Sequence, residues 1–174
     1  IKICFLRHDI DYSIENALKI AEIESNLNIF STFTVLLSGS DYNPLQKKSR
    51  EIIKKILKMG HEIGLHFDSS IYGITSESDL DEVIKIEKNI LEVIVDHNVK
   101  MFSFHNTSAF SMSCKKDFYG GCVNSYSNFF QNEVEYTSDS NGYWRFRSWE
   151  KLLEEKNNII QILTHPIWWK PNNC

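Results

Sequence analysis

The sequence predicts an α/β fold built on a mainly parallel β-sheet. Short apolar runs alternate along the chain with amphipathic stretches of helical spacing, and repeated strand–helix units of this kind build parallel sheets, open or closed into a barrel. The length of 174 residues fits one domain of ordinary size. We therefore expect residues 1–174 to form a single domain. Because the chain starts at Ile1, already inside a strand pattern, we also expect the full protein to contain further N-terminal residues.

Each predicted element has a local signal. Ser13 is a helix-capping residue, Pro44 is suited to opening a helix, and Gly60 to ending one. The segment from 110 to 147 is rich in Ser, Asn and aromatic residues, and only short strands near Val123 and Glu135 are expected there. The predicted elements are strands at 1–6, 31–37, 62–66, 100–104 and 159–163, and helices at 13–27, 44–60, 79–96 and 149–156.

Composition and charge narrow the classes of function. The hydrophobic content of 42% and the charged content of 24% are typical of globular proteins. A net charge of −4 argues against a nucleic-acid partner or an anionic membrane surface. No stretch approaches the ~20 apolar residues of a membrane span. The 4 cysteines form no C-x-x-C pair, and although Cys114 and Cys122 allow a disulfide, the pattern favours a reducing, cytoplasmic location.

Two carboxylates lie two positions apart after the first predicted strand, in Arg7-His8-Asp9-Ile10-Asp11. Side chains at i and i+2 share a face of a strand, so Arg7, Asp9 and Asp11 point the same way. Carboxylates this close repel each other unless a cation, a shared proton or water stabilises them. The pair therefore predicts a metal or catalytic site at the end of a buried strand.

Three histidines also fall at the ends of predicted strands. His66 ends the third strand, His105 follows the fourth, and His165 follows the last. The carboxyl ends of parallel strands meet at one edge of a sheet. We expect five residues to converge there: Asp9, Asp11, His66, His105 and His165. Structural roles are expected for the remaining histidines, His8, His61 and His97.

A carboxylate and one or two imidazoles form a suitable donor set for a divalent metal ion. Zn²⁺ accepts this mixture of ligands and keeps a position open for water. The ion lowers the pKa of that water and polarises a substrate carbonyl. A second carboxylate can then take the water proton, and a histidine on the far side can protonate the leaving group. The residues thus favour a metal-dependent hydrolase.

The order of these motifs resembles the polysaccharide deacetylases of carbohydrate esterase family 4, which contain the NodB-like domain. Residues 60–67, Gly-His-Glu-Ile-Gly-Leu-His-Phe, are similar to the family's G-H-E-I-G-N-H-T block. Leu163-Thr164-His165 is similar to its final L-x-H block, and residues 6–11 to its T-F-D-D block. The resemblance spans nearly the whole chain, and the block at 60–67 is its most specific part.

The resemblance implies an irregular (β/α)7 barrel that removes an N-acetyl group from a sugar, such as a precursor of a surface polysaccharide. It implies that Asp11 and His66 bind the metal, that Asp9 is the catalytic base and that His165 is the catalytic acid. The family's second metal histidine is absent, because Ser70 stands at its position, and Phe104-His105-Asn106-Thr107 replaces the family's R-x-P block. We therefore assign the third ligand to His105, with a metal held by fewer protein groups as the alternative.

The segment 136–145 is expected to border the site. Trp144 can stack on a sugar ring or cap the core, and Arg145 can orient Asp9 or a substrate anion. Trp168 and Trp169 either roof the same pocket or anchor the C-terminus. The predicted substrate-binding residues are Arg7, Asp139, Trp144 and Arg145.

Two other classes of function remain open. A carbohydrate-binding domain that has lost its chemistry accounts for Ser70 at the position of a ligand. A phosphatase of the haloacid dehalogenase type accounts for Asp9-Ile10-Asp11 after a buried strand, with Mg²⁺ as the ion, but it leaves the imidazoles without a role.

Overall fold

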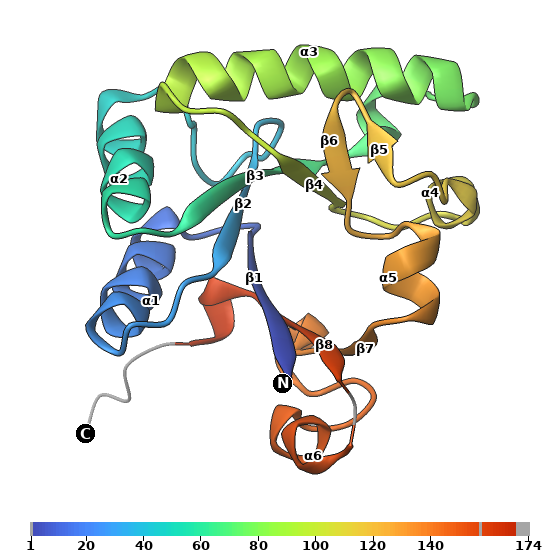
Figure 1. Ribbon diagram of the computed structural model, residues 1–174. Helices are drawn as coiled ribbons and strands as arrows, with labels where there is room; N and C mark the ends of the chain where they lie inside the picture. Colours follow the sequence, from blue (N-terminus) through green and yellow to red (C-terminus); the bar gives the residue numbers. More distant parts are fainter. Residues whose placement is uncertain (1, 157, 170–174) are drawn as a thin grey trace.

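The computed structural model describes residues 2–156 and 158–169. Its centre is a curled sheet with the strand order β5-β6-β4-β3-β2-β1-β8-β7 (Figure 1). From β6 to β7 every neighbouring pair of strands is parallel, and β5 is antiparallel to β6. The α/β class with mainly parallel strands is confirmed. Because β5 and β7 are the two ends of this order, the described strands form a half-barrel.

The strands are β1 (Ile3–Ile10), β2 (Thr32–Leu36), β3 (Glu62–Phe67), β4 (Met101–Phe104), β5 (Phe118–Tyr119), β6 (Cys122–Asn124), β7 (Glu135–Ser138) and β8 (Ile159–Thr164). The α-helices are α1 (Ile14–Asn26), α2 (Lys47–Lys58), α3 (Glu77–Val95), α4 (Ala109–Ser113), α5 (Asn128–Asn132) and α6 (Trp149–Glu154). Short 3-10 helices are η1 (Ser69–Tyr72), η2 (Ser140–Gly142) and η3 (Pro166–Trp168). In Figure 1, α1 and α2 lie side by side against the sheet, and α3 runs along its top.

Strand β1 is longer than its sequence pattern predicts. The predicted end at residue 6 was wrong, and the strand continues to Ile10. Arg7, His8 and Asp9 continue the strand and pair with β2. These polar residues are 2–3% exposed, whereas the apolar Ile3 is 48% exposed. A hydrophobic pattern cannot identify a strand segment whose polar side chains are buried against one another.

The predicted long helices are present, with boundaries shifted by a few residues. Ser13 caps α1 by accepting a hydrogen bond from the Asn16 backbone N–H at 3.2 Å. Helix α2 begins at Lys47 rather than at Pro44, because Asn43 Oδ1 accepts the Leu45 N–H in a preceding turn. Just beyond the end of α2, Gly60 has φ +96°, a conformation that glycine adopts without strain.

The strand register arranges polar side chains in a row across the sheet. Asp9 lies opposite Thr34 of β2, and His66 lies opposite Ser103 of β4. Gly64 lies opposite Thr34 in this row. The absence of a side chain leaves room for the Met101 sulfur, which would lie only 2.4 Å from a Cβ on Gly64. The main apolar core lies between the other face of the sheet and the helices; it includes Ile10, Phe33, Val35, Ile63, Leu65 and Phe102.

The segment from 110 to 147 contains the expected short strands, β6 and β7. It also contains α4, β5 and α5, which are too short to produce a periodic sequence signal. Cys114 and Cys122 are buried free thiols, so the disulfide that the sequence allowed is not formed. Among the described helices, none combines the length and apolar composition that a bilayer span requires.

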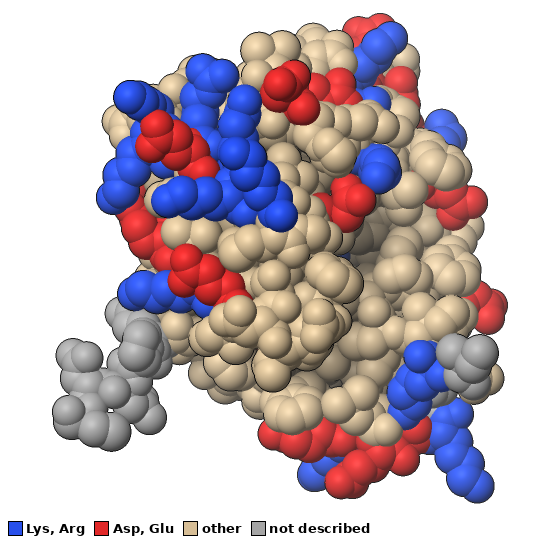
Figure 2. All heavy atoms as spheres, turned by 60° about the vertical axis from the view of Figure 1, so that its left-hand side comes forward, with Lys and Arg blue, Asp and Glu red and all other residues tan. Residues whose placement is uncertain are grey.

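Charge is unevenly distributed on the surface. Lys and Arg side chains gather over α2, with few acidic side chains among them (Figure 2). The other long helices, α1 and α3, carry acidic and basic residues together. Although the net charge of the chain is negative, the face over α2 is therefore strongly basic.

Candidate metal centre and active site

Three predicted metal ligands form a compact triangle at the carboxyl ends of the strands. His66 Nε2 lies 3.0 Å from Asp11 Oδ1. His105 Nδ1 lies 3.3 Å from the same oxygen and 3.2 Å from His66 Nε2. Asp11 follows β1, His66 lies in β3 and His105 follows β4, so three separate segments contribute to the triangle.

The triangle has the dimensions of a metal-ligand set. Ligand atoms about 2.0–2.1 Å from a tetrahedral ion are separated by about 3.3 Å. The three observed separations are 3.0, 3.2 and 3.3 Å. Two imidazoles and one carboxylate suit Zn²⁺ and related divalent ions and leave coordination positions for water or substrate. The residues of this chain therefore fit a divalent metal ion.

Hydrogen bonding prepares these ligands for a cation. Burial raises the pKa of Asp11, but hydrogen bonds from His105 and His66 outweigh it and hold this pKa below its usual range. His66 Nδ1 lies 2.7 Å from Ser103 Oγ, and this contact holds the ring with Nε2 directed at the triangle. Ser103 therefore fixes the orientation of a ligand. Ser70 lies outside the triangle, where it hydrogen-bonds Asp68.

Asp9, the predicted base, is held in a different environment. It is 2% exposed, and its Oδ1 accepts hydrogen bonds from Thr34 at 2.6 Å and Ser103 at 3.3 Å. Burial raises the pKa of Asp9, but the positive charges of Arg7 and His66 and the hydrogen bond from Thr34 outweigh it. The pKa therefore lies below its usual value, and Asp9 is a carboxylate at neutral pH.

Arg7, predicted to bind substrate, is buried and contacts Asp9. The guanidinium is 3% exposed, with Nε 3.0 Å and Nη2 3.2 Å from the Asp9 oxygens. Nη1 donates to Ser125 at 2.8 Å, and the guanidinium lies 5.6 Å from the centre of the Tyr126 ring. These contacts give Arg7 a role in positioning Asp9. The sequence analysis missed Ser125 and Tyr126 because they belong to the irregular segment.

His165, the predicted acid, faces the metal triangle and is oriented by Asp139. Its Nε2 lies 3.9 Å from Asp11 Oδ2, and its Nδ1 lies 2.7 Å from Asp139 Oδ1. Burial lowers the pKa of His165, but the hydrogen bond to Asp139 and the charges of Asp9 and Asp11 raise it above its usual value. This environment favours the protonated imidazole that a general acid requires.

Asp139, a predicted substrate-binding residue, is buried against His165. It is 4% exposed, and it also accepts a hydrogen bond from Trp169 Nε1 at 2.8 Å. The indole of Trp169 thus helps to hold the carboxylate against His165. Of the two roles left open for Trp169, this contact favours anchoring.

Among the described residues, no interaction joins the remaining two predicted substrate-binding residues to the triangle. Trp144 is half-buried in a second apolar cluster around Leu152, with its ring 6.5 Å from that of Trp169. This is the packing role that the sequence left open. Arg145 is exposed, and no interaction within the described residues joins it to Asp9. The orienting role suggested for Arg145 is filled by Arg7.

The other histidines have structural surroundings, as expected. His8 lies on the opposite face of β1, where its ring nitrogens contact Thr164 at 2.6 Å and Glu24 at 2.9 Å. His61 contacts Ser31 and the Ala21 carbonyl behind the sheet. His97 is exposed and lies 3.8 Å from Glu62.

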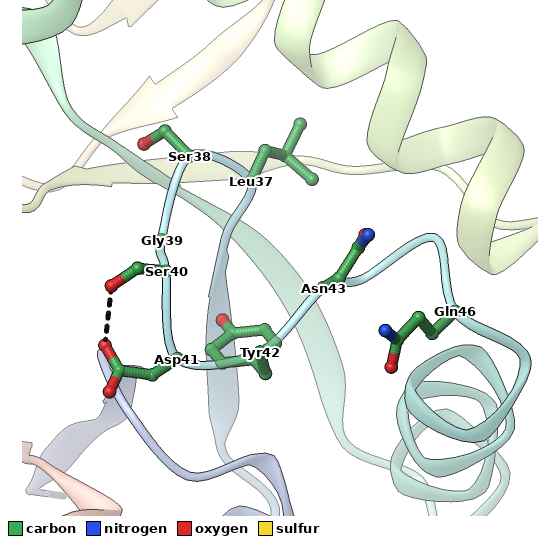
Figure 3. A pocket seen from close by; sticks show the side chains of 8 residues that line it. All are labelled: Leu37, Ser38, Gly39, Ser40, Asp41, Tyr42, Asn43 and Gln46. Atoms are coloured by element: carbon green, nitrogen blue, oxygen red, sulfur yellow. Dashed lines mark hydrogen bonds between the residues drawn. The ribbon is translucent and has the colours of Figure 1, made fainter.

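A polar pocket adjoins the candidate centre, and the sequence analysis missed it. It has a volume of about 470 Å³ (Figure 3). The Tyr42 hydroxyl donates to the Ile10 carbonyl at 2.8 Å and accepts from the Leu36 N–H at 2.9 Å, which fixes the pocket to the end of β1. The pocket is lined by Leu37, Ser38, Gly39, Ser40, Asp41, Tyr42, Asn43 and Gln46. A polar loop between a strand end and a helix is the sequence signal for such a site.

Solved structures show which known fold this chain shares. It superposes on a family 4 acetyl xylan esterase from Clostridium thermocellum in complex with a cobalt ion, with a TM-score of 0.59, 17% identity, and coverage of 99% of this chain and 77% of that chain. The peptidoglycan deacetylase PdaC from Bacillus subtilis gives a TM-score of 0.56 at 15% identity over 96% of this chain and 76% of that chain. The chain has the fold of carbohydrate esterase family 4. The resemblance seen in the motifs is thus confirmed for the fold.

A third structure with this fold is a family 4 pseudoenzyme from Bacillus anthracis. It gives a TM-score of 0.57 at 13% identity over 95% of this chain. The present chain spans 55% of the length of that protein. No protein-family model matches the sequence, and no curated protein matches it. The shared fold does not by itself establish an activity, which depends on the residues of the site.

Proposed function

We propose that this chain is a divergent member of carbohydrate esterase family 4 and a metal-dependent hydrolase that removes the N-acetyl group of an amino sugar. The observation that carries the proposal is the metal-sized triangle of Asp11, His66 and His105 beside a buried carboxylate and an oriented imidazole. The cobalt complex of the esterase from Clostridium thermocellum supports a divalent ion in this fold. Zn²⁺ is the ion we propose.

The residues divide the chemistry of amide hydrolysis among themselves. A divalent ion bound by the triangle would acidify a water molecule and polarise the acetyl carbonyl. Asp9, charged and held by Arg7 and Thr34, accepts the proton of the attacking water. His165, held by Asp139, donates a proton to the departing nitrogen. The base and the acid are separate residues whose environments hold them in opposite protonation states.

Acetate release tests this proposal. The purified protein with added Zn²⁺ is incubated with a neutral oligomer of N-acetylglucosamine, and released acetate is measured with and without a chelator. We expect Asp9→Asn to lower kcat by about 10²–10⁴-fold, because that is the range supplied by general-base catalysis. The zinc content of the variant should equal that of the wild type, since Asp9 lies outside the triangle.

The same assay distinguishes the other classes of function. A metal-free protein that binds the oligomer without releasing acetate would identify a carbohydrate-binding domain without catalysis, the class to which the pseudoenzyme and Ser70 point. Phosphate release dependent on Mg²⁺ would identify a phosphatase. The convergence of His66 and His105 on Asp11 argues against the latter, because a phosphatase of that type has no use for them.

A further inference from the structure

Helix α2 carries an unusual concentration of positive charge. Its 12 residues include Lys47, Lys48, Arg50, Lys54, Lys55 and Lys58 and a single acidic residue, Glu51. The whole chain, in contrast, has a net charge of −4 with 19 Lys and Arg residues. A helix face in contact with water does not need basic residues alone, since α1 and α3 carry acidic and basic residues together.

Most of these cations lack an ionic partner in the part of the chain that the structure describes. Lys48 pairs with Glu15 at 2.6 Å, and Lys47 lies 4.0 Å from Glu51. Among the described residues, no acidic group lies within ion-pair distance of the other four basic side chains of α2: Arg50, Lys54, Lys55 and Lys58. Their charges are available to an anion outside the chain, and Figure 2 shows Lys and Arg side chains gathered on this face of the molecule.

The basic face starts where the polar pocket ends. Gln46 lines the pocket and is followed directly by Lys47, the first residue of α2 (Figure 3). Lys47, Arg50 and Lys54 are spaced by three and four residues, so they form a stripe along the helix away from the pocket. At the other end of the pocket, a Cβ on Gly39 would lie 3.9 Å from the Asp11 carbonyl oxygen. The pocket therefore extends from the Asp11 backbone, beside the metal triangle, to the start of the basic stripe.

The two surfaces suit different parts of one ligand. The pocket offers hydroxyl, amide and carboxylate groups from Ser38, Asn43 and Asp41, which bind uncharged hydroxyl groups. The stripe offers ammonium groups and the forked guanidinium of Arg50, which bind carboxylate or phosphate groups. A glycan with both neutral and acidic units matches this order.

We infer that the substrate is an anionic glycan whose acidic units lie along the α2 stripe of Lys47, Arg50 and Lys54 while an N-acetylated unit occupies the metal centre. This inference rests on the proposed function for the identity of the reacting unit. The contiguity with the catalytic edge favours a glycan over a lipid surface, because a membrane-binding face has no reason to begin at the pocket.

Binding measurements test the inference separately from catalysis. The probes are a hyaluronan hexasaccharide, in which glucuronate alternates with N-acetylglucosamine, and the same hexasaccharide with its carboxylates reduced to alcohols. We expect the protein without metal to bind the acidic form about tenfold more tightly at low salt, and 0.5 M NaCl to remove the difference by screening. In the variant Lys47→Gln/Arg50→Gln/Lys54→Gln the preference should disappear at any salt concentration.

A matched variant controls for net charge. Lys85→Gln/Lys115→Gln/Lys151→Gln loses the same number of charges from exposed positions on other segments, and it should keep the wild-type preference. Equal affinity of the wild type for the two hexasaccharides, or equal loss in the two triple variants, overturns the inference. So does tighter binding to vesicles containing anionic lipid than to the acidic hexasaccharide. Failure to release acetate from the neutral oligomer refutes the proposed function instead, and leaves the binding result to be judged by itself.

Discussion

Asp9 and Asp11 lie two residues apart, yet their neighbours give them different chemistry. Asp9 is surrounded by hydroxyl groups and the Arg7 guanidinium, which hold a buried carboxylate in its charged form. Asp11 is surrounded by imidazoles, whose lone pairs can share a cation with it. The mutual repulsion of the two acids is thus relieved by separate partners, the Arg7 guanidinium for Asp9 and the imidazoles for Asp11.

Loss of a ligand should be measurable as loss of metal affinity. We expect His105→Ala to weaken Zn²⁺ binding by at least about 100-fold, since even partners of the ligands contribute about 10–100-fold. Ser70→Ala, at the position where the family pattern has a histidine, should leave the affinity unchanged. Competition with a chromophoric chelator measures both constants. Equal affinity of the His105 variant and the wild type would show that the metal is held by fewer protein groups.

The hydrogen bond from His165 to Asp139 should be visible in the pH dependence of activity. The general acid acts in its protonated form, so activity is lost as the pH rises through the pKa of His165. Asp139 raises this pKa, and Asp139→Asn should therefore move the alkaline limb of the kcat profile to lower pH. A profile that is reduced in height but not shifted would show that Asp139 acts on the fold only.

The residues of the candidate site were easier to predict from the sequence than the side chains that they contact. The blocks at 6–11, 60–67 and 163–165 identified the two acids and the two histidines that the fold brings to one edge. The burial of Arg7 and Asp139 was not predicted, because the sequence shows a charged residue near a site without showing its surroundings. Each is held by contacts that include a predicted catalytic residue: Asp9 for Arg7 and His165 for Asp139.

At the scale of elements, α3 contains a buried acid outside the site. Glu87 is 3% exposed and accepts a hydrogen bond from Tyr72, while no hydrogen bond reaches its second oxygen among the described residues. Burial raises the pKa of Glu87 to about 7, against the effect of the Tyr72 hydrogen bond. The folded state therefore favours protonated Glu87 and loses this stability as the pH rises from about 4.3, the unfolded value, through 7.

Replacing this acid should stabilise the protein above neutral pH. Glu87→Gln keeps an oxygen for the Tyr72 hydroxyl and cannot ionise. We expect it to raise the free energy of unfolding by about 1–3 kcal/mol at pH 8, because each pKa unit corresponds to about 1.4 kcal/mol. At pH 4, where Glu87 is protonated in both states, the difference should vanish. Urea unfolding at the two pH values measures this, and a gain independent of pH would refute the titration argument.

Elements with strong local signals were predictable, and short ones were not. Ser13, Gly60 and the apolar spacing of α3 located helices correctly within a few residues. The polar half of β1 was missed because its burial depends on partners more than a hundred residues away, such as Ser125 for Arg7 and Thr164 for His8. Local propensity carries no information about such partners.

For the whole molecule, the site depends on the tertiary fold. Its residues come from the ends of β1, β3, β4 and β8, which are adjacent only in the folded sheet. An ion that binds this arrangement therefore stabilises the native state. At a Zn²⁺ concentration of 100 times its dissociation constant, the gain is about 2.7 kcal/mol, which corresponds to about 5–10 °C in Tm for a chain of this size.

This stabilisation has a simple control. Asp11→Asn removes the carboxylate shared by both imidazoles, and its Tm should not respond to Zn²⁺ or to a chelator. Differential scanning fluorimetry of both proteins, with and without metal, measures the effect. The same Tm increase in wild type and variant would place the metal elsewhere.

The sequence by itself determined the fold class, the order of the long elements and the residues able to bind a cation, because periodicity and short motifs are local properties. The tertiary structure decided which groups face each other: Arg7 with Asp9, Asp139 with His165, and the pocket with the basic face of α2. These pairings depend on burial and on strand register across the sheet. Both arise from contacts between distant segments, and no local pattern encodes them.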